Sequence, residues 1–215
     1  MQEARSPIAM RWIAVASCIG VAVFVIVCTA AQFLRSDLDW TQAPLSFYLI
    51  GPGGWIVKIA YIALSASLAG IGTGFHRSLG AASRGRIPML LFVISAIALA
   101  VTAISDTSTK HGDASLHARI HLVAAGTTFV CVTSAMLLQS LRLREDARWR
   151  PASGFASALA IAAFLALWIY ALSHVLPKGL MQKTVIALIL AWLGWAARAL
   201  WREAARQDTA NGISG

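Results

Sequence analysis

Six stretches of this chain are long and apolar enough to cross a lipid bilayer as helices, which takes about 20 residues each. They cover roughly residues 12–34, 53–75, 88–105, 119–141, 154–173 and 184–201. Hydrophobic residues fill 58% of the 215 positions and charged residues only 13%, which is too apolar for a soluble domain. We therefore predict an all-α fold: residues 1–215 form one polytopic six-helix membrane bundle, with 202–215 as a polar cytoplasmic tail.

The positive charges indicate which helix ends face the cytoplasm, because cytoplasmic loops of membrane proteins carry an excess of Lys and Arg. A cytoplasmic N-terminus places one large group of arginines on that side: Arg5, Arg11, Arg77, Arg84, Arg86, Arg142, Arg144, Arg148, Arg150, Arg198, Arg202 and Arg206. The opposite loops hold fewer cations: Arg35, Lys110, Arg119, Lys178 and Lys183. The sequence thus predicts an inner (plasma) membrane protein with both termini cytoplasmic. Topology explains the net charge of +9, so no nucleic-acid partner is expected.

The segment ISDTSTKHGDASLHARIHLVAAG, residues 104–126, gathers reactive side chains between two apolar runs. It contains His111, His117 and His121, and His174 maps to the same outer side of the predicted bundle. Only His76 maps to the cytoplasmic side. This asymmetry predicts a polar site that faces out of the cell.

Helical spacing suggests a metal site within this segment. Asp113, His117 and His121 recur every four residues and would share one helix face if the fourth helix begins near Asp113. Two imidazoles one turn apart can bind one zinc ion, and an open coordination position would activate water. The candidates for a third ligand are Asp106, His111 and His174, and those for the general base are Asp106 and Asp113.

A structural role for the same residues is the alternative. Asp113 or Ser115 could cap the fourth helix, while Arg119 and Lys58 could extend their charges to the headgroups. His121 is explained least well in this way, because it lies one turn deeper in the apolar run than His117, where ionisable groups are costly.

The connection between the first two predicted helices, RSDLDWTQAPLSFYLIGPGGW, is long for a compact bundle. Its Trp40, Phe47, Tyr48 and Trp55 are typical of an interfacial segment with rings at headgroup depth. One interpretation is therefore an aromatic anchor followed by a Gly/Pro turn. The other is a lid over a site on the outer face.

Several local patterns resemble a family of bacterial six-helix membrane proteins known as domain of unknown function 998. The matching residues are Ser46, Tyr48, Gly54, Trp55, Asp106, Gly112 followed by His117 or His121, and GLMQKTVIALILAW at 179–192. The resemblance implies a six-helix bundle with a site on its outer face, and no known reaction. This chain has Lys183 where the family usually has arginine, which keeps the charge but loses bidentate binding of an anion.

A more distant similarity in layout is to membrane hydrolases of the alkaline ceramidase type. These use a serine, an aspartate and three histidines around zinc, and the chain offers residues of these types in that order: Ser46, Asp106, His117, His121 and His174. The similarity is an analogy, because the predicted bundle has six helices rather than seven.

Three classes of function stay open. The first is a metal-dependent hydrolase or lipid-modifying enzyme, with Ser46 and the aspartates as catalytic candidates and Lys183, Arg119, Lys58 and Tyr48 as substrate-binding candidates. The second is a haem-binding redox protein that uses His121 and His174. The third is a non-enzymatic protein: a lipid- or pigment-binding subunit, or a small transporter. Membrane lipid is the expected partner, with a homo-oligomer or a larger membrane complex as further possibilities.

Overall fold

The computed structural model describes residues 7–105, 115–173 and 175–213, and every regular element among them is helical. The long helices are α1 (Pro7–Leu34), α2 (Gly54–Ser78), α3 (Arg86–Ile104), α4 (Leu116–Glu145), α5 (Arg150–Leu172) and α6 (Lys178–Ile213), and the short 3-10 helix η1 is Leu45–Leu49. All six long helices are long and apolar enough to cross a membrane. The predicted all-α, six-helix architecture is confirmed.

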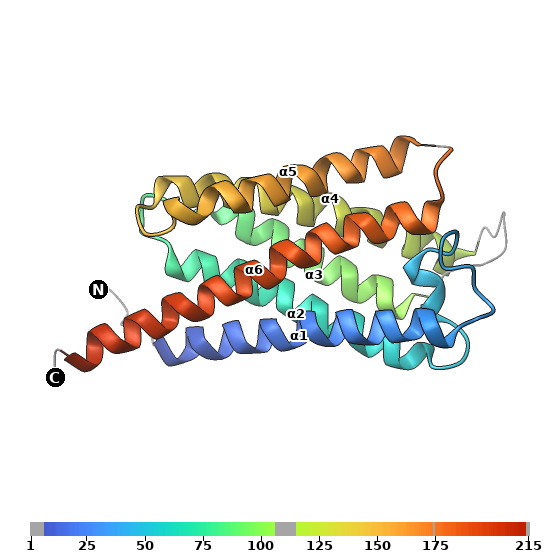
Figure 1. Cartoon of the computed structure of the whole chain (residues 1–215), viewed down its shortest axis with the longest axis horizontal. Coiled ribbons are helices and arrows are strands. Elements are labelled where there is room, and N and C mark those ends of the chain that lie inside the picture. The colour runs from blue at the N-terminus through green and yellow to red at the C-terminus, as the bar shows by residue number, and fades with distance from the viewer. Residues whose placement is uncertain (1–6, 106–114, 174, 214–215) are drawn as a thin grey trace.

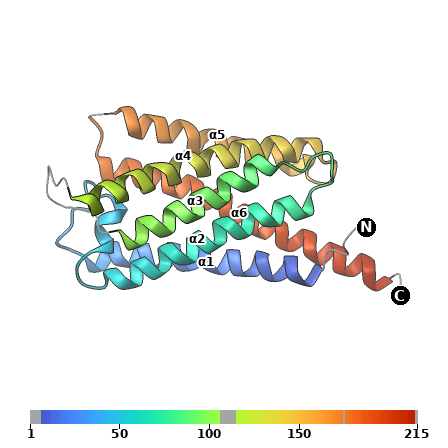
Figure 2. The ribbon, with the colours of Figure 1, turned by 180° about the vertical axis from the view of Figure 1, so that it is seen from behind.

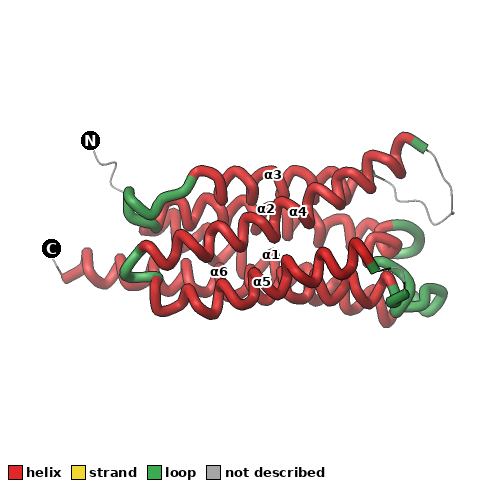
Figure 3. The backbone as a smooth tube through the Cα atoms, turned by 90° about the horizontal axis from the view of Figure 1, so that it is seen from above, coloured by secondary structure: helices red, strands yellow, loops and turns green. Residues whose placement is uncertain are grey.

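The helices form a ring in chain order. Each packs against the next one, α6 returns to α1 to close the ring, and α2 also contacts α6 across it. Figure 1 shows the helices along one long axis, with the two termini at the same end, and Figure 3 shows the connections confined to the two ends. We call the end with the termini and loops 79–85 and 146–149 the terminal end, and the opposite end the η1 end.

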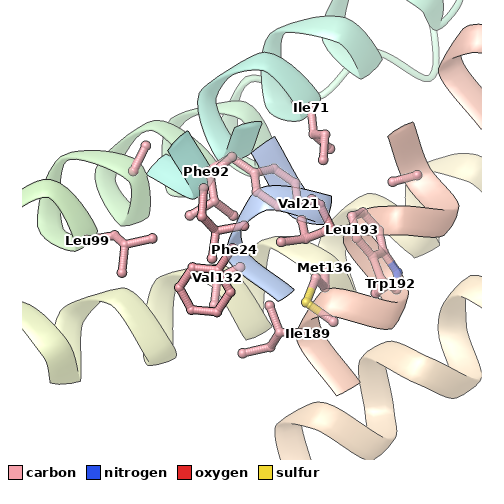
Figure 4. Close-up of a cluster of buried hydrophobic side chains, with 14 of the residues drawn as sticks. Val21, Phe24, Ile71, Phe92, Leu99, Val132, Met136, Ile189, Trp192 and Leu193 are labelled. Atoms are coloured by element: carbon pink, nitrogen blue, oxygen red, sulfur yellow. The ribbon is translucent and has the colours of Figure 1, made fainter. Parts of the chain in front are cut away.

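Trp192 is the largest of the fully buried side chains and belongs to the hydrophobic cluster shown in Figure 4. Its side chain is fully buried, its ring stacks on Phe92 at 5.7 Å between centroids, and its indole N–H donates to the Ala156 carbonyl at 3.1 Å and the Ser140 hydroxyl at 3.3 Å. An apolar ring with a satisfied polar atom thereby joins α3, α4, α5 and α6. Large apolar side chains such as Trp12 also lie exposed on the outside of the bundle, as contact with lipid requires.

The helices extend beyond the apolar runs that predicted them. The residues of the predicted polar tail that the structure describes continue α6 as helix to Ile213. Glu203 and Ala204 within that part are buried, and Gln207 donates to the Glu203 carboxylate at 3.1 Å. Hydropathy reports the hydrocarbon-facing length of a helix, whereas backbone hydrogen bonding and packing decide where the helix ends. Figure 2 shows this part of α6 projecting past the other helices.

A buried acidic cluster around Arg148 holds the terminal end together. The Arg148 guanidinium donates to Asp146 at 3.2 Å, to Glu203 of α6 at 2.9 Å and to the Ser78 carbonyl at the end of α2 at 2.7 Å. The backbone N–H of Gly80 donates to Asp146 at 3.0 Å. Burial raises the pKa of Asp146, but the hydrogen bonds from Arg148 and Gly80 outweigh it, so this pKa lies below its ordinary value of 3.8.

We predict that Arg148→Ala lowers the free energy of unfolding by about 1–2 kcal/mol, because it leaves two buried carboxylates without their cation. The loss is smaller than for a fully enclosed pair, since 48% of the Arg148 side chain is exposed. Thermal unfolding in detergent checks this. Arg144→Ala is the matched control, because that exposed arginine donates to no acidic side chain within the described residues. Equal stability of the two variants would contradict the assigned role of the cluster.

Candidate functional site

A groove of about 500 Å³ runs between α4 and α5 at the η1 end of the bundle. Its walls are the α4 residues from Ala118 to Val130 and the α5 residues from Leu167 to Ala171, and Pro44–Phe47 and Gln182 close it at one end. Leu122 and Trp168 on its rim are exposed on the outside of the bundle. In a membrane-spanning chain, such a groove opens sideways toward lipid.

Polar side chains from four elements meet along this apolar groove: Ser46, Arg119, His121, Tyr170 and Gln182. The sequence analysis proposed the first three of these residues. The fold brings them into one lining, although Ser46 and His121 are 75 positions apart in the chain. Tyr170 and Gln182 were missed. The signal for Gln182 was its place in the GLMQK pattern; nothing in the sequence singles out Tyr170.

His121 presents a defined tautomer to the groove. Its ring is 6% exposed, and Nδ1 lies 3.0 Å from the carbonyl oxygen of Ser105 at the end of α3. A carbonyl only accepts hydrogen bonds, so Nδ1 carries the proton, and in the neutral ring Nε2 then keeps its lone pair. His121 therefore joins α3 to α4 through one nitrogen and offers a base or a ligand atom at the other.

The predicted stripe of Asp113, His117 and His121 assumed that the fourth helix begins near Asp113, which itself lies outside the described residues. Helix α4 begins at Leu116, and Ser115 caps it by accepting a hydrogen bond from the Ala118 N–H at 3.2 Å. The predicted cap at Ser115 is thus confirmed. His117 lies in the first turn and is exposed, unlike His121. Because Ser115 caps the helix, α4 begins later in the chain than the histidine spacing suggested.

Four predicted site residues lie outside the described residues: Asp106, His111, Asp113 and His174. Within residues 7–105, 115–173 and 175–213, no three His, Cys, Asp or Glu side chains gather as a metal site would require. Two described histidines lie on this side of the bundle: His121 lines the groove, and His117 is exposed on the surface. Within the described residues, a zinc ion could use only these two imidazoles on this side.

Lys183 holds the connection between α1 and α2 in place. Its ammonium donates to the carbonyl oxygens of Trp40 and Ala43, the latter at 3.1 Å, and lies over the rings of Trp40 and Tyr48 at 5.9 and 5.6 Å from their centroids. Tyr48 is buried beneath it. In this arrangement, Lys183 anchors the loop through these contacts, and a substrate-binding role for Lys183 and Tyr48 stays a prediction. An arginine at position 183 could make the same carbonyl and ring contacts. Lys58, the remaining substrate-binding candidate, is half-buried near the start of α2.

The first turns of α6 complete this anchor. The Leu45 N–H donates to the Gln182 side chain at 2.8 Å, and the Leu180 N–H donates to the Thr41 carbonyl at 2.8 Å. A Cβ atom on Gly179 would lie 2.5 Å from the Ala43 carbonyl oxygen, so only glycine permits this approach. The GLMQK pattern thus encodes a docking surface for residues 40–49, which we call the η1 roof.

Arg35 joins the two segments that flank the η1 roof. It donates two hydrogen bonds of 2.8 Å to the Asp37 carboxylate and one of 2.7 Å to the Ile50 carbonyl. Its hydrogen bonds hold the pKa of Asp37 below the ordinary value. The turn into α2 then uses Gly51 and Gly53 at φ values of +79° and +74°. Ser46 and Phe47 of the roof also line the groove, so the anchored segment borders this space. The aromatic-anchor and lid interpretations of the segment stay predictions.

The six apolar helices define the class: this is an integral membrane protein, and a lateral groove lies between two of its helices. Residues 18–199 match the family described as protein of unknown function, DUF998, so the chain belongs to that family, as its motifs suggested. No curated protein and no solved structure matches the chain. The alkaline-ceramidase-like layout stays an analogy from the sequence.

We predict that Lys183→Met loosens the η1 roof. Removing the charged donor leaves two carbonyl groups unpaired and should lower stability by about 1–2 kcal/mol, with faster amide hydrogen exchange confined to residues 40–49. Lys183→Arg is the control and should retain protection, because it keeps the charge and the donors. Unchanged exchange in the methionine variant would show that Lys183 does not anchor the roof.

Proposed function

We propose that this protein binds a membrane lipid in the groove between α4 and α5. The observation that carries the proposal is the groove itself, which has apolar walls on the outside of a membrane bundle and polar groups at its closed end. A lipid combines these two characters, with apolar chains and a polar headgroup. Arg119 and His121 lie on α4 where a headgroup near the membrane surface would meet them.

The orientation belongs to the same proposal. The terminal end carries the arginine-rich segments, so the positive-inside rule assigns it to the cytoplasm and the groove to the outer leaflet. The plasma membrane is the proposed location. The groove is formed within one chain, so the proposal requires neither a homo-oligomer nor a larger complex.

Gly126→Phe tests lipid binding. Gly126 lines the groove and has no heavy atom within 4 Å of an added Cβ, so a phenyl ring can enter without displacing the backbone. We expect purified Gly126→Phe protein to lose the lipid that the wild type retains through purification, as measured by native mass spectrometry. Gly154→Phe is the matched control, because Gly154 is an exposed α5 glycine in equally open space outside the groove lining. Equal lipid content in the two variants would refute the proposal.

A second candidate is a lipid-modifying enzyme, and the tautomer of His121 favours it. An Nε2 lone pair in the groove could accept a proton from water or from the Ser46 hydroxyl, which lines the same groove and has no hydrogen-bond partner in the described parts of the chain. Zinc would need ligands in addition to His121, and haem would need a second axial residue. The candidates Asp106, His111 and His174 lie outside the described residues.

His121→Gln separates catalysis from binding. If the protein hydrolyses lipid esters, we expect this variant to lose about 100-fold or more of the rate of fatty-acid release from phospholipid vesicles, while its bound lipid is kept. His76→Gln is the control, since His76 at the terminal end also pairs its Nδ1 with a backbone carbonyl, that of Gly85 at 3.3 Å. Absence of hydrolysis by the wild type, with bound lipid present, would leave the binding function alone.

A further inference from the structure

Behind the groove lies a cavity of about 70 Å³ in the middle of the bundle. Side chains from α1, α2, α3, α4 and α6 line it, among them Phe24, Leu64, Leu99, Val132 and Leu193. The cavity and the groove share four lining residues, Ser46, Ala125, Phe129 and Gln182, so the two spaces adjoin at these side chains beneath the η1 roof. We call this shared boundary the neck.

The cavity wall away from the neck is mostly apolar, with the hydroxyl groups of Tyr61, Thr102 and Thr128 as its polar atoms. Thr102 and Thr128 line it, but each hydroxyl donates to the carbonyl four residues earlier in its own helix, both at 2.9 Å. Tyr61 packs its ring against Phe24 with centroids 5.1 Å apart. Ser46 and Gln182 provide polar atoms at the neck itself. An apolar cavity gives water too few partners, so hydrocarbon is its favoured occupant.

The charge of the groove adds a second constraint on the ligand. Arg119 is exposed, lines the groove and has no acidic partner among the residues the structure describes. The groove lining contains no Asp or Glu within those residues. A guanidinium beside the low-dielectric membrane favours an anionic group.

We propose, resting on the lipid-binding function above, that the ligand is an anionic amphipath whose hydrocarbon chain passes from the groove through the neck into the central cavity. Its headgroup stays in the groove beside Arg119 and His121. Moving a hydrocarbon chain from the bilayer into the cavity gains little hydrophobic free energy, because the lipid tails that it leaves are as apolar as the cavity wall. Occupancy is instead stabilised by dispersion contacts that the empty cavity lacks and by the charge of Arg119.

Photocrosslinking of the wild-type protein tests the path. The first probe is a long-chain fatty acid with a diazirine at the distal end of its chain, and the second is a phosphatidylglycerol whose acyl chain carries the same group. We expect adducts on Leu64, Leu68 or Leu99, which line the cavity and are buried from the bilayer. The probe that gives them identifies the source as free fatty acid or phospholipid.

Two variants assign the route. Gly126→Phe should lose the cavity adducts and Gly154→Phe should keep them, with size-exclusion profiles confirming that both variants are folded. Adducts on groove residues such as Leu122 and Trp168 without any in the cavity would overturn the path while leaving lipid binding in the groove intact. Adducts in neither place would overturn both proposals. Cavity adducts that persist in Gly126→Phe would overturn access through the groove.

The charge preference has its own test. Arg119→Gln should weaken labelling by the fatty-acid probe about fivefold, the size expected for one partly exposed charge pair. Labelling by the matching long-chain alcohol, which is neutral, should not change. An equal loss for acid and alcohol, or none for the acid, would overturn the anionic assignment.

Discussion

The structure depends on how the backbone N–H and C=O groups find hydrogen-bond partners where the chain is not helical. Hydrocarbon offers no hydrogen bonds, so each membrane segment is a helix that pairs its own N–H and C=O groups. Residues 35–53 are the longest described departure from this rule, and the start of α6 supplies the missing partners. Gln182 accepts from the roof, the roof carbonyl of Thr41 accepts from Leu180, and Lys183 donates to two further carbonyls. This contact fixes α6 beside α1, closes the ring of helices and places the roof over one end of the groove.

The groove and the central cavity follow from the same contact. Gln182 both holds the η1 roof and lines the neck, so the residue that anchors the loop also shapes the polar part of the site. The opposite end of the bundle is closed differently, by the ionic cluster of Asp146, Arg148 and Glu203. The two ends of the bundle are therefore built differently: ionic contacts join the chain at the terminal end, and the groove lies at the η1 end.

The histidines show how a spacing pattern and a packing environment can disagree. His117 and His121 are one turn apart and suggest a shared ligand, yet the first is exposed and the second is buried with Nδ1 engaged by Ser105. The pattern cannot reveal that the end of α3 lies against α4 at this depth. His121 nevertheless was the residue whose position was hardest to explain by helix-end chemistry, and among the described histidines it is the one that lines the groove.

The sequence by itself determined the number of helices, the membrane character and the family, because length and hydropathy are local properties that the bilayer imposes on each segment separately. It also identified Ser46, Arg119 and His121 as candidates, since polar residues next to apolar runs stand out without knowledge of the fold. It placed Lys183 and Tyr48 among the substrate-binding candidates, and it missed Tyr170 and Gln182. Tertiary structure alone decided these roles: whether a side chain lines a groove or holds a loop depends on which distant backbone it meets, as Lys183 meets Ala43 across 140 positions.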